Sequence, residues 1–137
     1  MIVVCGVDGS ANAQHALQWS ADLVASTGGE VVAIHALGLV EMLGGEPIPA
    51  ASHRAEIEDL CVTVWCARLA DSGVPWRHAV LDGNPVDVML RAADEYAAGL
   101  IVVGRRGAGN APAIGSTSAE LARHATYPVA IVPSSGL

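Results

Sequence analysis

Five short apolar runs, separated by stretches with helical periodicity, constrain the fold of this chain more than any other feature. The runs cover residues 2–7, 31–37, 76–82, 100–104 and 129–133. Most are continuous and rich in β-branched residues, as is typical of strands buried on both faces. Strands that alternate with helices predict a parallel sheet with right-handed crossovers.

Capping residues mark the helices between these strands. Ser10 can cap the first helix, and Asn84 followed by Pro85 opens the third. Between these two helices a longer one is predicted over about 53–72. A short fourth helix begins near Ser116, where the following residues have the form of a capping box, Thr-Ser-Ala-Glu.

The segment 38–52 has Gly and Pro but no clean period, so it is predicted to be a loop. Its apolar residues are unusual for a loop. They could cover a pocket, or they could pack on a second subunit.

The predicted fold is α/β: an open five-stranded parallel sheet with helices on both faces and strand order 3-2-1-4-5. A length of 137 residues indicates a single domain, residues 1–137. The chain is 52% hydrophobic but contains no Phe, so its core must be built from aliphatic side chains. Such residues suit a parallel sheet covered by helices.

The net charge and the cysteine content limit which partners and which cellular compartment are expected for this protein. A net charge of −7 disfavours nucleic acid as a partner. No run is long enough to span a bilayer and no basic leader is visible, so a cytoplasmic protein without membrane partners is expected. The three cysteines are expected to be buried and reduced, with Cys61 and Cys66 on different faces of their helix.

The order 3-2-1-4-5 predicts a ligand site between the first and fourth strands. In an open sheet of this kind, ligands bind outside the carboxyl ends of the strands where the order reverses. Val7 and Asp8 end the first strand, and Gly104 begins a stretch with four glycines in twelve residues that includes Arg106. Glycines there would let backbone N–H groups approach an anion, as would the start of the next helix. A loop that only joins strand to helix remains the alternative.

The sequence motifs of other nucleotide-binding loops, of metal sites and of serine nucleophiles are absent from this chain. The glycine stretch is neither a Walker A loop nor a dinucleotide-binding fingerprint. The five histidines show no metal-ligand spacing, and no serine has the nucleophile-elbow context. No catalytic residue and no metal ligand are therefore predicted.

Several motifs together resemble the universal stress protein family along almost the whole chain. They are VDGS after the first strand, the IHA of the second, DGNPVDVML, LIVVGRRG, GSTSAEL and YPVAIVP. The resemblance implies the open sheet derived above and, for many members, binding of ATP or a related adenine nucleotide. Their signature is Gly-x2-Gly-x9-Gly-Ser/Thr.

The resemblance also implies a set of contacts. Asp8 takes the place of an aspartate that contacts adenosine, and the backbone of Ala36 that of a residue at the adenine edge. Val103 and Gly104 would lie under the ribose and phosphates. The phosphate contacts would come from Gly107, Gly115, Ser116 and Thr117.

One departure from the signature is clear. Only seven residues, AGNAPAI, separate Gly107 from Gly115, where the signature has nine. Pro112 also removes a backbone donor. The anchoring glycines are present, so a pocket is still expected, with an altered affinity or phosphate preference.

The resemblance therefore implies a stress-response binding or regulatory module that takes ATP, with or without Mg²⁺, and slow ATP hydrolysis is the most that is expected as an activity. The alternative is a dimeric interaction module of the same family without a nucleotide. An ATP-pyrophosphatase-type enzyme is a third interpretation, but the Ser-Gly-Gly-x-Asp-Ser loop is absent. The last strand, Val129–Pro133, is apolar and lies at the predicted sheet edge, which favours a homodimer formed through it.

Overall fold

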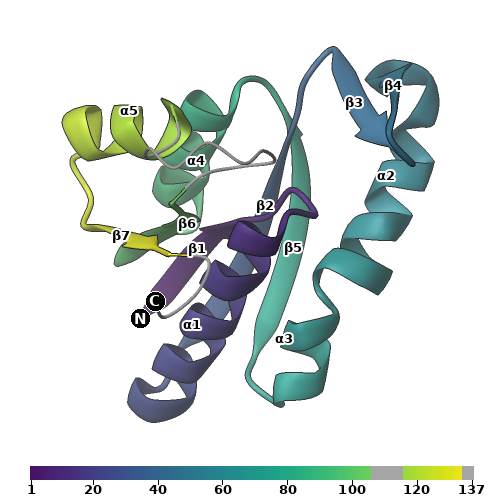
Figure 1. Cartoon of the computed structure of the whole chain (residues 1–137). Helices are drawn as coiled ribbons and strands as arrows, with labels where there is room; N and C mark the ends of the chain where they lie inside the picture. Colours follow the sequence, from purple (N-terminus) through teal and green to yellow (C-terminus); the bar gives the residue numbers. More distant parts are fainter. Residues whose placement is uncertain (106–115, 134–137) are drawn as a thin grey trace.

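The computed structural model describes residues 1–105 and 116–133, and a five-stranded parallel sheet forms its centre (Figure 1). The strands in spatial order are β5 (Trp76–Asp82), β2 (Glu30–Leu37), β1 (Ile2–Gly6), β6 (Leu100–Gly104) and β7 (Val129–Val132). Numbered along the chain, these five strands have the order 3-2-1-4-5. The predicted α/β fold, sheet type and strand order are confirmed.

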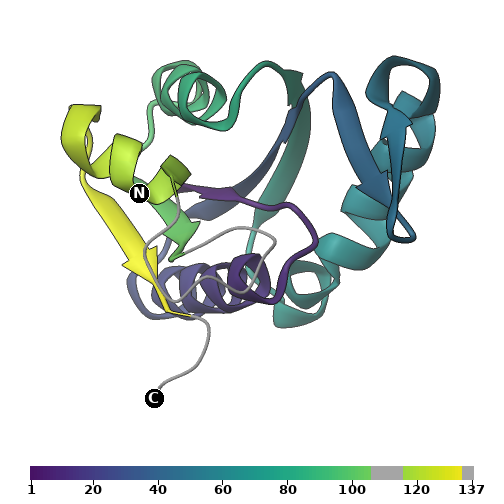
Figure 2. The same ribbon diagram turned by 45° about the horizontal axis from the view of Figure 1, so that its top comes forward.

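Helices cover both faces of the sheet. Helices α1 (Ala11–Thr27), α2 (Arg54–Leu60) and α3 (Ala67–Ser72) lie on one face, and α4 (Pro85–Glu95) and α5 (Ser116–His124) on the other (Figures 1 and 2). Alternate residues of each strand enter two separate apolar clusters, one under each helix layer. The central strands β1 and β6 are therefore buried on both faces, as their apolar sequences require.

The predicted caps of α1 and α4 are confirmed. The Ser10 hydroxyl accepts a hydrogen bond from the Ala13 N–H at 3.2 Å, and the Asn84 side chain accepts one from the Asp87 N–H at 3.0 Å. Each cap satisfies a donor that the first turn of a helix leaves unpaired.

The segment predicted to be a loop contains a β-hairpin instead. Strands β3 (Val40–Leu43) and β4 (Glu46–Pro49) pair antiparallel and project beyond the end of β2 (Figure 1). Gly44 and Gly45 form the two-residue turn with φ of 58° and 81°. Two adjacent glycines permit this hairpin turn because both central residues need a positive φ. The Gly-Gly pair, rather than the overall Gly and Pro content of the segment, was therefore the feature that indicated a hairpin.

The helix predicted over 53–72 is interrupted. A 3₁₀ turn, η1 (Ala50–His53), precedes α2, and a π-helical turn, η2 (Cys61–Trp65), separates α2 from α3. The Cys66 N–H donates to the Cys61 carbonyl at 2.9 Å, the i to i+5 bond of a π turn. This wider turn aligns the two cysteines, so both are fully buried in one cluster. The expectation that they occupy different faces is wrong.

Within the described ranges, no helix has the length and apolar character needed to cross a membrane.

Candidate functional site

The switch point of the sheet brings the predicted site residues of β1 and β6 to one edge. The register pairs Cys5 with Val102, which places Val7 level with Gly104. Val7 and Val103 are buried, whereas Asp8, directly after Val7, is exposed at the edge. The helices that follow β1 and β6 along the chain, α1 and α5, lie on opposite faces of the sheet.

A tight turn holds Asp8 in place. The Ser10 N–H donates to Asp8 Oδ1 at 2.9 Å. Gly9 has a φ of 83°, and a Cβ at this position would lie 2.7 Å from Trp65 Nε1. Only glycine therefore fits between the turn and Trp65. The second carboxylate oxygen, Oδ2, has no hydrogen-bond partner among the described residues.

Gly104 is required by packing as well as by its place at the edge. A Cβ on Gly104 would meet the Asn12 backbone carbon, its oxygen and its Cβ, all at 2.9 Å. Helix α1 thus begins against the end of β6. Asn12, which sequence reasoning missed, is buried there, and no described residue bonds to its Oδ1.

The start of α5 faces the same edge. Ser116 and Thr117 are the first two residues of α5 and are exposed and half-buried. The capping box predicted from Thr117 to Glu120 is wrong, because its first residue would have to precede the helix and Thr117 already lies inside α5. Glu120 instead pairs with Arg123 at 3.1 Å and His124 at 3.2 Å.

Ser118 is a second residue that the sequence did not reveal. Its buried hydroxyl donates to the Gly104 carbonyl at 2.6 Å, which fixes the start of α5 to the end of β6. A serine two residues after a predicted helix start carries no signal of such a bond. The consequence is that Ser116 and Thr117 are held beside Gly104, where free N–H groups at a helix start favour an anion.

Three predicted site residues, Arg106, Gly107 and Gly115, lie outside the described residues. Ala36 is half-buried near the end of β2, one strand from β1. The described members of the set, from Val7 to Thr117, thus come from β1, β2, β6 and α5 and lie along the carboxyl edge of the sheet.

A chain of hydrogen bonds joins this edge to the hairpin. His35 Nδ1 lies 2.7 Å from the Val7 carbonyl oxygen, and because a carbonyl only accepts, Nδ1 must carry the hydrogen. His35 Nε2 bonds to Glu41 Oε1 on β3, and because an ionised carboxylate also only accepts, this bond takes a second ring hydrogen, on Nε2. The His35 ring also contacts Trp65, with centroids 4.9 Å apart. His35 thus both packs and forms hydrogen bonds. The sequence analysis did not predict its partner Glu41, because it did not predict the hairpin that carries Glu41.

The part of the chain that the structure describes contains no cluster of metal-binding side chains. No group of three or more His, Cys, Asp or Glu side chains there could hold a metal ion. Any ion at this edge would depend on Asp8 and on the ligand's own oxygens.

The fold is that of an open α/β protein, and the described members of the predicted site lie along the carboxyl edge of its sheet. The family model of the universal stress protein family matches residues 1–133. The chain belongs to the universal stress protein family.

Relatives and solved structures agree with that assignment. A Thermus aquaticus protein, "Universal stress protein in QAH/OAS sulfhydrylase 3'region", is 30% identical over 133 residues, which are 95% of this chain and 96% of that one. The crystal structure of a universal stress protein in complex with cAMP has 26% identity and a TM-score of 0.67, with 98% of each chain covered. A universal stress protein from Archaeoglobus fulgidus in complex with dAMP has 24% identity and a TM-score of 0.71, covering 96% of this chain and 97% of that one.

Proposed function

We propose that this protein is an adenine-nucleotide-binding regulatory module of the stress response, acting in the cytoplasm and taking ATP with or without Mg²⁺. The observation that carries the proposal is the convergence of Asp8, Gly104 and the start of α5 at one edge of the sheet. A similar chain that binds cAMP, an adenine nucleotide, supports it.

Each described group has a role that suits its chemistry. Asp8 Oδ2 would accept from a ribose hydroxyl, and Ala36 would meet the adenine edge with its backbone. Val103 and Gly104 would lie under the ribose, at the carboxyl end of β6. Ser116 and Thr117 would offer backbone N–H groups and hydroxyls to phosphate oxygens. Arg106, Gly107 and Gly115 are proposed for the phosphates on sequence alone.

The second candidate is a dimeric interaction module without a nucleotide, favoured by the two-residue shortening between Gly107 and Gly115. Mass analysis of purified protein for bound nucleotide separates the two candidates directly. Gly115→Val should abolish ATP binding in calorimetry without unfolding the chain. Equal affinity in variant and wild type would mean that the phosphates bind elsewhere.

Asp8→Ala tests the nucleoside end of the site. The variant should bind both ATP and adenosine more weakly, by about 1–3 kcal/mol for a hydrogen bond to a charged group. Asp22→Ala, which removes an exposed carboxylate of α1 that accepts from Gln18, is the matched control and should bind normally. A loss for ATP but not for adenosine would assign Asp8 to phosphate or magnesium instead.

We also propose a homodimer through β7. This strand and β5 are the edges of the sheet, and β5 carries the charged residue Arg77 and exposed His78, whereas β7 is entirely apolar. An apolar edge strand invites pairing with a second copy about a two-fold axis.

The backbone pattern selects the variant that tests this dimer. The carbonyls of Pro128 and Val132 accept from β6, so in a parallel pair Ala130 also faces β6, while Ile131 presents its N–H to the open edge. Ile131→Pro should therefore convert a dimer to a monomer in light scattering without removing a hydrogen bond between β6 and β7. A wild-type mass of 14.0 kDa, that of one chain, would refute the dimer.

A further inference from the structure

A cavity of about 850 Å³ opens next to Ala36, on the side of β2 that faces β5. It lies between the ends of these two strands, the hairpin and the start of α4. This volume falls within the range of about 300–1,000 Å³ that is usual for small-molecule sites. Ala36, Leu37, Leu39 and Ala50 give it apolar walls.

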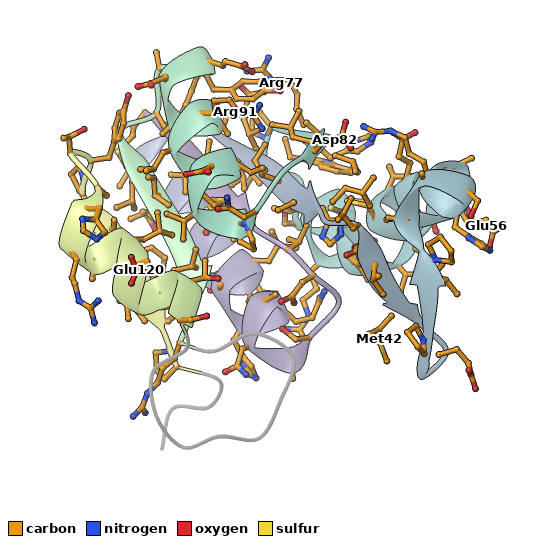
Figure 3. The ribbon with its side chains drawn as sticks, turned by 90° about the horizontal axis from the view of Figure 1, so that it is seen from above. Met42, Glu56, Arg77, Asp82, Arg91 and Glu120 are labelled. Atoms are coloured by element: carbon orange, nitrogen blue, oxygen red, sulfur yellow. The ribbon has the colours of Figure 1, made fainter. Side chains whose placement is uncertain are left out.

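Three charged side chains, those of Glu41, Arg54 and Asp82, line the cavity. Arg54 and Asp82 form an ion pair with each other. Arg54 Nη1 donates to Asp82 Oδ1 at 2.6 Å, and its Nη2 donates to the Val80 carbonyl at 2.9 Å. Figure 3 shows Asp82 at the end of β5. This ion pair leaves Glu41 as the third charged group of the wall.

Glu41 is fixed in position by a single hydrogen bond. Its Oε1 bonds to His35, whose other ring nitrogen donates to the Val7 carbonyl. The Glu41 side chain is only 17% exposed, and Oε2 has no hydrogen-bond partner in the part of the chain that the structure covers. A held, largely desolvated carboxylate with one unused oxygen is a selective acceptor for an N–H donor.

We propose that this cavity receives the purine base of the nucleotide and that Glu41 selects a base with an exocyclic 6-amino group. The inference rests on the nucleotide-binding function proposed above. The apolar side chains of the wall suit the ring, and Glu41 Oε2 accepts from the amino group. A 6-oxo purine would instead place a carbonyl lone pair against the carboxylate, which is repulsive.

Calorimetry with three nucleotides tests the selection: ATP, inosine triphosphate and N6,N6-dimethyl-ATP, which has no N–H at position 6. Wild type should bind ATP about 10- to 100-fold more tightly than the other two, the usual effect of one hydrogen bond to a charged acceptor. Glu41→Met removes the acceptor at similar length and should reduce that ratio to about one, mainly by weakening ATP. Glu46→Met, at the exposed turn end of the same hairpin, should keep the wild-type ratio.

The outcomes separate this inference from the proposed function. If none of the three nucleotides binds wild type, both fail. If all bind alike, or if Glu41→Met keeps the preference for ATP, only the role of Glu41 is overturned. Circular dichroism checks that the Glu41 variant is folded; if it is not, less than about a threefold wild-type preference for ATP over its dimethyl derivative overturns the inference.

Discussion

Gly104→Ala should destabilise the protein because the start of α1 leaves no room for a methyl group. The added Cβ would lie 2.9 Å from three atoms of Asn12, two of them backbone. Backbone atoms of a packed helix cannot move away as the end of a flexible side chain can. Overpacking of this kind costs about 1–3 kcal/mol.

Gly6→Ala is the matched control, since Gly6 holds the corresponding position near the end of the neighbouring strand β1. Its added Cβ would lie 3.5 Å from Met89 Sδ and 3.6 Å from a Val103 methyl group, which is ordinary contact. Neither glycine has a positive φ, so the backbone conformation at both positions is one that alanine adopts without strain, and only the space around the added Cβ differs. Gly6→Ala should therefore be neutral or gain about 0.4–1 kcal/mol by restricting the unfolded chain.

Urea denaturation measures both variants. The difference in free energy of unfolding between them should be about 1–4 kcal/mol, with an unchanged m value. Equal stability would show that α1 is not held against β6, and the packing explanation for Gly104 would be wrong.

Two further predictions concern buried polar groups. Ser118→Ala should lower the free energy of unfolding by about 0.5–1.5 kcal/mol in the same assay, because the bond to the Gly104 carbonyl is lost; an unchanged midpoint would contradict this. Burial raises the pKa of the Cys5 thiol to about 12, so the unfolded chain, whose thiols titrate near about 8.5, loses that proton first. Stability should therefore fall as pH rises from about 9 to 12, and fall less steeply in Cys5→Ala; identical slopes would exclude Cys5 as a source.

The sheet could be predicted because local and global signals agree along its strands. Continuous apolar runs such as residues 100–104, with caps at Ser10 and Asn84, fit only buried parallel strands joined by helices. The hairpin was missed because Gly44-Gly45 was weighed as a loop signal instead of as a turn between two short strands. The π turn at Cys61–Trp65 has no local sequence signal, since its geometry depends on tertiary packing.

The candidate site likewise contains residues that the sequence predicted and residues that it did not. Asp8, Gly104 and Ser116 follow from strand order, because their positions depend on which strand ends are neighbours. Asn12 and Ser118 do not, since each acts through one contact with Gly104 that no spacing rule contains. Residues that position a site are therefore harder to predict than residues that line it.

The last prediction concerns the bond by which the hairpin is held to the sheet. His35 bonds to both Val7 and Glu41, so it joins β1, β2 and β3. Because Leu39 is 92% exposed and Val40 60% exposed, few apolar contacts hold this part of the hairpin. The His35–Glu41 bond should then account for much of its attachment. A double-mutant cycle with His35→Asn and Glu41→Met should give a coupling free energy of about 0.5–3 kcal/mol, as for other residues in direct contact.

Hydrogen exchange shows where that energy acts. Glu41→Met should speed exchange of the amide of Ala50, which directly follows the hairpin and bonds to the Leu39 carbonyl at 3.0 Å. The amide of Val7, which bonds to the Ile34 carbonyl at 2.9 Å inside the sheet, should keep its protection. Coupling below about 0.3 kcal/mol, within the range for independent sites, would mean that the hairpin is attached by other contacts. Faster exchange at both amides would instead show that His35 and Glu41 stabilise the whole carboxyl edge, so that the hairpin and the proposed nucleotide site open together.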